Sequence, residues 1–163
     1  MWYKAVIADE YQYFQVASLD DREILQALSN TPETVFSFSM ATKNRQKKGE
    51  LSVIDDASLI VFKKDITSVF NGIGEFIQIK GLDDYNLLVP DVIDALDVEK
   101  SEIDYFRGTQ EIKRIRKYVF NSKVDGKKVF KLPITASPVF FSSDVLDIYN
   151  ENGFQGVDFV EIK

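Results

Sequence analysis

The sequence predicts an α+β fold, in which a mixed, mostly antiparallel sheet carries a few short helices packed on one face. Two observations predict this class. Apolar runs of strand length recur along most of the chain and are separated by glycine, proline and charged turns. One stretch near the C-terminus, residues 138–162, contains a strand, a capped helix, a glycine turn and a second strand. We expect its helix to be central among the helices.

This C-terminal unit begins with an apolar run over 139–141, which predicts a buried strand. The hydroxyl of Ser142 or Ser143 can cap the following helix by accepting a hydrogen bond from a free N–H of its first turn. Gly153 ends the helix, because glycine enters the left-handed conformation without a Cβ clash, and a Schellman motif would place Phe154 against the helix. The helix has one apolar stripe: Val145, Leu146, Ile148 and Tyr149.

The remaining elements follow from the same patterns. Gly156 turns the chain into a final strand over 157–162. Other strands or apolar runs are expected at 2–8, 11–17 (a short strand or an extended arm), 35–40, 58–62, 75–79, 85–89, 92–96 and 129–132. A capping box at Ser18 predicts a helix that stops near Asn30, before Pro32. Asp65 is expected to cap a short helical turn that ends at 71–72.

Residues 111–120, EIKRIRKYVF, fit two structures. A helix would align Ile112 and Ile115 with Val119, whereas a strand would alternate cations with apolar residues. The β-branched residues favour the strand. Asp125-Gly126 then predicts a hairpin with a type I′ turn.

Composition limits the chemistry that this chain can perform. Its 163 residues fit one domain, with a separate small lobe over 1–80 as the alternative. There is no Cys and no His, so disulfides, thiolate metal sites and histidine-based catalysis are excluded. Carboxylate chemistry stays open. We expect no cofactor, no metal site, no catalytic residue and no enzyme activity.

The charge balance bears on partners and location. The net charge is −6 and the pI is about 4.8, which disfavours binding to phosphate backbones. Two basic clusters, Lys43–Lys48 and Lys113–Lys117, leave a nucleic-acid contact as an alternative; the first is expected to be an exposed loop. The start of the chain lacks an apolar leader and no run reaches ~18 apolar residues, so we expect a cytoplasmic protein without a membrane contact.

Six carboxylates follow the second proline: Asp91, Asp94, Asp97, Glu99, Glu102 and Asp104. Their spacing lacks the glycine and the alternation of a Ca²⁺ loop. A glycosidase pair would need two carboxyl groups about 5–9.5 Å apart in a cleft, and nothing in the sequence indicates this. We interpret the stretch as a solvated acidic edge.

The C-terminal half resembles a bacterial family among the immunity proteins of polymorphic toxin systems, the eleventh immunity class. The residues that carry the resemblance are Lys100, Ser101, Phe130, Leu132, Phe141, Ser142, Gly153, Gly156 and Phe159. Lys131 stands where the family usually has Arg. Phe141 matches the end of the family's apolar strand, but it stands where the family usually has Val. The region is 81–163, and residues 1–80 resemble nothing recognised. The resemblance implies a protein that binds and neutralises a cognate toxin.

The first hypothesis is therefore a non-enzymatic immunity protein; a carboxylate-based hydrolase and a nucleic-acid-binding regulator are the alternatives. An inhibitor needs exposed aromatic or arginine anchors inside a charged rim. Two stretches offer them: Tyr105, Phe106 and Arg107, and Asp83, Asp84 and Tyr85 beside Asp91. An acidic rim would speed encounter with a basic toxin. The alternative is that Tyr105 and Phe106 pack into the core, and solvent accessibility separates the two.

Overall fold

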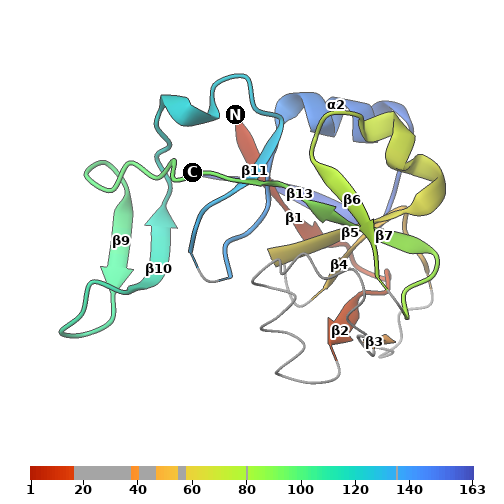
Figure 1. Cartoon of the computed structure of the whole chain (residues 1–163), viewed down its shortest axis with the longest axis horizontal. Coiled ribbons are helices and arrows are strands. Elements are labelled where there is room, and N and C mark those ends of the chain that lie inside the picture. Colours follow the sequence, from red (N-terminus) through yellow and green to blue (C-terminus); the bar gives the residue numbers. More distant parts are fainter. Residues whose placement is uncertain (17–37, 41–46, 55–57, 80, 135) are drawn as a thin grey trace.

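The computed structural model describes residues 1–16, 38–40, 47–54, 58–79, 81–134 and 136–163, and strands dominate them (Figure 1). The strands form sheets of five, six and two members, and most neighbours are antiparallel. The fold is thus mainly β, with few helices, rather than a balanced α+β arrangement. The expected helix over 18–30, the first residues of the strand at 35–40 and the basic loop over 41–46 lie outside the described residues.

The five-stranded sheet joins the two ends of the chain. Its order is β13 (Val157–Glu161), β1 (Trp2–Ile7), β12 (Phe140–Ser142), β11 (Val129–Lys131) and β8 (Asp91–Val92). β1 is antiparallel to both of its neighbours, and β8 is parallel to β11. The N-terminal strand therefore lies inside a sheet whose other members come from the C-terminal half.

The six-stranded sheet is formed by the N-terminal half and β7. Its order is β3 (Phe38–Met40), β2 (Phe14–Val16), β4 (Leu51–Ile54), β5 (Leu59–Lys63), β7 (Tyr85–Val89) and β6 (Glu75–Gln78). The sequence patterns did not identify β4, which follows directly on the basic loop. All four of its residues are buried, so it shows a short apolar run without alternation, the pattern of a strand covered on both faces.

The largest core cluster joins the two large sheets. Leu51 and Phe62 from the six-stranded sheet share it with Phe141 from the other sheet and with Val145 and Tyr149 from a helix. A second, aromatic cluster packs Trp2 and Phe120 edge-on against Phe130, with ring centroids 4.7 and 5.1 Å away. Edge-to-face packing of this kind is the favoured geometry of aromatic pairs.

The C-terminal unit forms largely as the sequence predicts. Helix α2 (Ser143–Glu151) ends at Asn152, and Gly153 adopts φ +65°. The N–H of Phe154 donates to the carbonyl of Tyr149 at 3.1 Å, and the N–H of Gly153 donates to Asn150 at 3.0 Å, the two hydrogen bonds of a Schellman motif. Ser142 occupies the N-cap position, as one of the two predicted candidates. The predicted capping hydrogen bond is wrong, because the hydroxyl of Ser142 makes none. Ser142 is instead held in the strand ladder opposite Trp2.

Replacing Gly153 by valine is expected to lower the free energy of unfolding by more than about 1 kcal/mol, because a β-branched residue resists the left-handed conformation. No atom lies within 4 Å of a Cβ built at Gly153, so the cost is one of backbone conformation alone. Urea denaturation measures it. Gly153→Asn is the matched control and should cost less, since asparagine tolerates this conformation. Equal midpoints for valine and wild type would show that the position is not a helix cap.

Two turns differ from the sequence prediction. The 3₁₀ helix η2 (Lys64–Phe70) forms, but its N-cap is Lys63 and Asp65 lies in its first turn. After η3 (Ser122–Val124), Asp125 has φ −61° and ψ 129° and Gly126 has φ +73°, which are the angles of a type II turn. The hairpin prediction is wrong as well, because β11 pairs antiparallel with β12 and parallel with β8, and not with the strand that directly precedes the turn.

The two-stranded sheet is a ribbon made of β9 (Glu102–Tyr105) and β10 (Ile112–Lys117). The strand expected within 111–120 is confirmed. Two register shifts interrupt its pairing, one between Ile112 and Arg114 and one between Ile115 and Lys117. Each shift inserts one extra residue, as a β-bulge does. Because of the extra residue between them, Ile112 and Ile115 can lie on the same face of the strand. Residues three apart also share one face of a helix, which is why the sequence of this segment fitted both structures.

Candidate functional site

The ribbon of β9 and β10 projects away from the two large sheets at one end of the molecule (Figure 1). Its tip carries two exposed aromatic rings: Tyr105 is 42% and Phe106 is 46% exposed. Arg107 beside them is also exposed. The alternative, in which both rings pack into the core, is wrong. Large exposed apolar side chains that cluster on a projecting element mark a contact surface more often than scattered ones do.

Hydrogen bonds order the turn at this tip. The carbonyl of Phe106 accepts from the N–H of Thr109 at 3.0 Å and from its hydroxyl at 3.1 Å. The same hydroxyl accepts from the N–H of Glu111 at 3.1 Å. Gly108 at φ +76° permits the reversal. The aromatic side chains are thus presented on a turn whose backbone is already fixed, which lowers the entropic cost of binding.

The base of the ribbon is held by Ser101. Its hydroxyl accepts from the N–H of Val119 at 3.0 Å and donates to the carbonyl of Val119 at 3.3 Å. Next to it, Lys100 forms an ion pair of 2.9 Å with Asp97, and this hydrogen-bonded pair lowers the pKa of Asp97. Of the Lys100-Ser101 pair that the sequence singled out, Ser101 therefore fastens the two segments where the ribbon leaves the body of the protein, and Lys100 stabilises the turn before β9.

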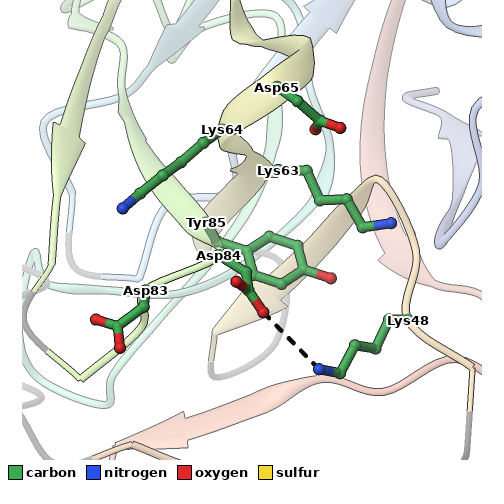
Figure 2. A pocket seen from close by; sticks show the side chains of 7 residues that line it. All are labelled: Lys48, Lys63, Lys64, Asp65, Asp83, Asp84 and Tyr85. Carbon is green, nitrogen blue, oxygen red and sulfur yellow. Dashed lines mark ion pairs between the residues drawn. The ribbon is translucent and has the colours of Figure 1, made fainter.

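The second predicted stretch lies elsewhere, at an open hollow of about 470 Å³ beside the start of β7 (Figure 2). Charged side chains of both signs line it, together with one tyrosine: Lys48, Lys63, Lys64, Asp65, Asp83, Asp84 and Tyr85. Lys48 reaches Asp84 with its ammonium 3.8 Å from the carboxylate. A second hollow of about 280 Å³ adjoins it and shares several of these residues. Three cations face three carboxylates, so the hollow has no strong preference for either sign of ligand.

The prediction of Tyr85 as an exposed anchor is wrong, because only 3% of the surface of this residue is exposed. Its hydroxyl donates to the carbonyl of Gly49 at 2.7 Å, and its ring packs edge-on against Phe14. Burial, and the carboxylates of Glu50, Asp84 and Asp65 after it, raise the pKa of Tyr85 to about 12. Tyr85 thus forms the floor of the hollow and belongs to the core.

The structure does not bring the two predicted stretches together. β7, whose first residue lines the hollow, lies on the right of Figure 1, and the ribbon lies on the left. Asp83 and Asp84 are exposed beside the hollow, whereas Asp91 pairs with Lys127 at 2.8 Å on the edge strand β8. Asp83 and Asp84, at the start of β7, thus lie apart from the ribbon that carries Tyr105 and Phe106.

Within the described residues, no group of three or more carboxylates is placed to hold a metal ion. The helices of that same part of the chain are all too short or too polar to cross a membrane. The arrangement found is one of contact surfaces: an ordered aromatic tip on a projecting ribbon, and a shallow hollow of balanced charge.

Comparison with known families gives the class of protein to which this chain belongs. The description that matches is the Immunity protein family (Imm11), over residues 80–163, just over half of the chain. The chain belongs to this immunity protein family, and its function is of the immunity type. The resemblance seen in the C-terminal half is confirmed. The matched residues contain α2 and the whole ribbon; β1 lies outside them. No curated protein matches the chain.

Proposed function

We propose that this protein binds a cognate bacterial toxin and neutralises it without catalysis, and that the tip of the β9–β10 ribbon is the contact surface. One observation carries the proposal beyond the family: Tyr105 and Phe106 are exposed on an ordered turn within the family-matched residues. The inhibitor would act either by occluding the active site of the toxin or by locking the toxin in an inactive form.

The chemistry of the tip supports this role. Tyrosine and arginine are the residues most often found among the few that dominate binding energy, because each combines a large contact area with hydrogen-bonding groups. Arg107 stands at the outermost turn, directly after the two rings. A narrow ribbon with such a tip suits a concave surface on the partner, such as a catalytic cleft. We also propose that the chain works as one domain, because β1 and the C-terminal strands share one sheet.

The double variant Tyr105→Ala with Arg107→Ala is expected to fold normally and to lose protection. Both side chains are exposed, so their removal changes stability by no more than about 0.5 kcal/mol. Loss of two central anchors weakens binding by about 2 kcal/mol or more, which is at least about 30-fold in affinity. The measurement is survival of cells that express the C-terminal toxin domain encoded by the neighbouring gene together with each variant.

The matched control removes an exposed apolar side chain and an exposed cation from η2, as Val69→Ala with Lys64→Ala. It should protect as wild type does. Full protection by the ribbon variant would reject the tip as the contact surface, and loss of protection by the control alone would move the interface to the hollow beside Lys64. If wild type neither protects nor binds the toxin domain, the proposed function itself fails.

A further inference from the structure

The fold pairs most carboxylates of the acidic stretch 91–104 with cations. Five of its six carboxylates have a cation within 4.0 Å: Asp91 with Lys127, Asp94 with Lys123, Asp97 with Lys100, and Glu102 and Asp104 with Arg116. Only Glu99 has no ion pair among the described residues. Most carboxylates of the acidic rim expected around the aromatic tip are therefore paired with lysine or arginine side chains and contribute less free charge to the surface.

The ribbon itself is cationic. Residues 102–117 contain five cationic and three acidic side chains, a net charge of +2 in a chain of net charge −6. Arg116 forms ion pairs with Asp104 at 3.2 Å and with Glu102 at 4.0 Å. The other four cations are exposed and have no ion-pair partner among the described residues: Arg107, Lys113, Arg114 and Lys117. Glu111 is the one carboxylate of the ribbon that has no ion pair among the described residues.

The bulges of β10 concentrate this charge. Ile112 and Ile115 are partly buried on one face, and between and after them Lys113, Arg114 and Lys117 are exposed. A regular strand would turn every second side chain inward; each bulge adds a residue and leaves more of the strand's side chains outside. The bulges also break the regular row of N–H and C=O groups, so an added strand would pair poorly along this edge.

We propose that the β9–β10 ribbon docks on an acidic protein surface of the toxin, with Tyr105 and Phe106 filling an apolar depression inside that acidic surface. This rests on the proposed function and specifies its partner. The four unpaired cations would find carboxylates, and the ion pairs would steer the encounter. A protein fits better than nucleic acid, because the chain belongs to an immunity protein family, and the partner of an immunity protein is a protein toxin.

The test compares two double variants that each remove two exposed lysines without an ion pair in the described part of the chain: Lys113→Gln with Lys117→Gln on the ribbon, and Lys64→Gln with Lys128→Gln away from it. Association and dissociation rates with the purified C-terminal domain of the neighbouring toxin are measured from about 50 mM to about 200 mM salt. A random-sequence DNA duplex serves as a second probe under the same conditions.

The ribbon variant should associate about tenfold more slowly than wild type at low salt, with a flatter salt dependence, while the control stays within about twofold. The proposal is overturned if the two variants behave alike, or if the ribbon variant binds faster, which would indicate a basic partner. Ribbon-dependent binding to the duplex, without ribbon-dependent binding to the toxin domain, would assign the cations to nucleic acid. A toxin domain that wild type does not bind at all would overturn both this inference and the proposed function.

Discussion

Replacing Gly156 by alanine is expected to lower the free energy of unfolding by at least about 3 kcal/mol. Gly156 adopts φ +122°, and a Cβ built on it would lie 2.0 Å from the carbonyl oxygen of Leu51 and 2.9 Å from the Cα of Gly49. Both obstacles are backbone atoms, so no side chain can turn aside to make room.

The backbone cannot move away cheaply either. The carbonyl of Gln155 accepts hydrogen bonds from Glu50 at 2.7 Å and Leu51 at 3.2 Å, and the carbonyl of Gly156 accepts from Ala8 at 3.1 Å. The Glu50 carboxylate also accepts from the N–H of Gln155 at 2.9 Å. A methyl group at residue 156 would have to separate these strands, and each broken buried hydrogen bond costs about 1–3 kcal/mol.

Gly153→Ala is the matched control for this prediction. Gly153 also has positive φ, but open space surrounds its Cβ position, so alanine should cost only about 1–2 kcal/mol there. Chemical denaturation of both variants measures the difference. Equal losses would show that conformational strain accounts for both positions and that the close approach of Gly49 and Gly156 is relaxed in solution.

The second large effect is a rise in stability between about pH 8 and pH 10, due to Lys131. This lysine is 5% exposed, and its ammonium donates to the carbonyl of Ser58 at 2.9 Å. Burial lowers its pKa from 10.5 to about 8. In the unfolded chain the lysine keeps its proton up to the ordinary pKa. The unfolded state therefore binds more protons than the folded state between these two values, and stability increases as the pH rises.

The expected gain is about 3 kcal/mol at most, from about 1.4 kcal/mol for each pKa unit. Above about pH 10 two tyrosines act in the opposite direction, because burial raises the pKa of Tyr85 and of Tyr149 to about 12 and the unfolded tyrosines ionise first. Stability should consequently pass through a maximum near pH 10.

The variant Lys131→Met isolates the lysine. Its free energy of unfolding should exceed that of wild type at pH 7, and the advantage should shrink by about 2–3 kcal/mol by pH 10. Lys128→Met, at an exposed lysine close by in the sequence, should run parallel to wild type over the whole range. A constant difference between Lys131→Met and wild type would mean that Lys131 titrates normally.

Local patterns alone determined several elements. The C-terminal unit could be predicted because its signals act over a few residues: the stripe of Val145 and Tyr149, the left-handed Gly153, and Phe154 folded back on the last turn. The strand at 85–89 and the turn at Gly156 were equally local. The family could be predicted for the same reason, since five of the nine residues that carry the resemblance lie within this unit.

The tertiary structure alone decided which faces are covered. Tyr85 and Tyr105 each stand in a short strand next to an acidic residue, yet one is 3% and the other 42% exposed. The strand of Tyr85 lies inside a six-stranded sheet, between β5 and β6, whereas the strand of Tyr105 has β10 as its one neighbour among the described strands. The same holds for the acidic stretch, in which Asp94 and Asp91 pair with lysines 29 and 36 residues further along the chain. Burial and net local charge depend on segments distant in sequence, which periodicity and spacing do not encode.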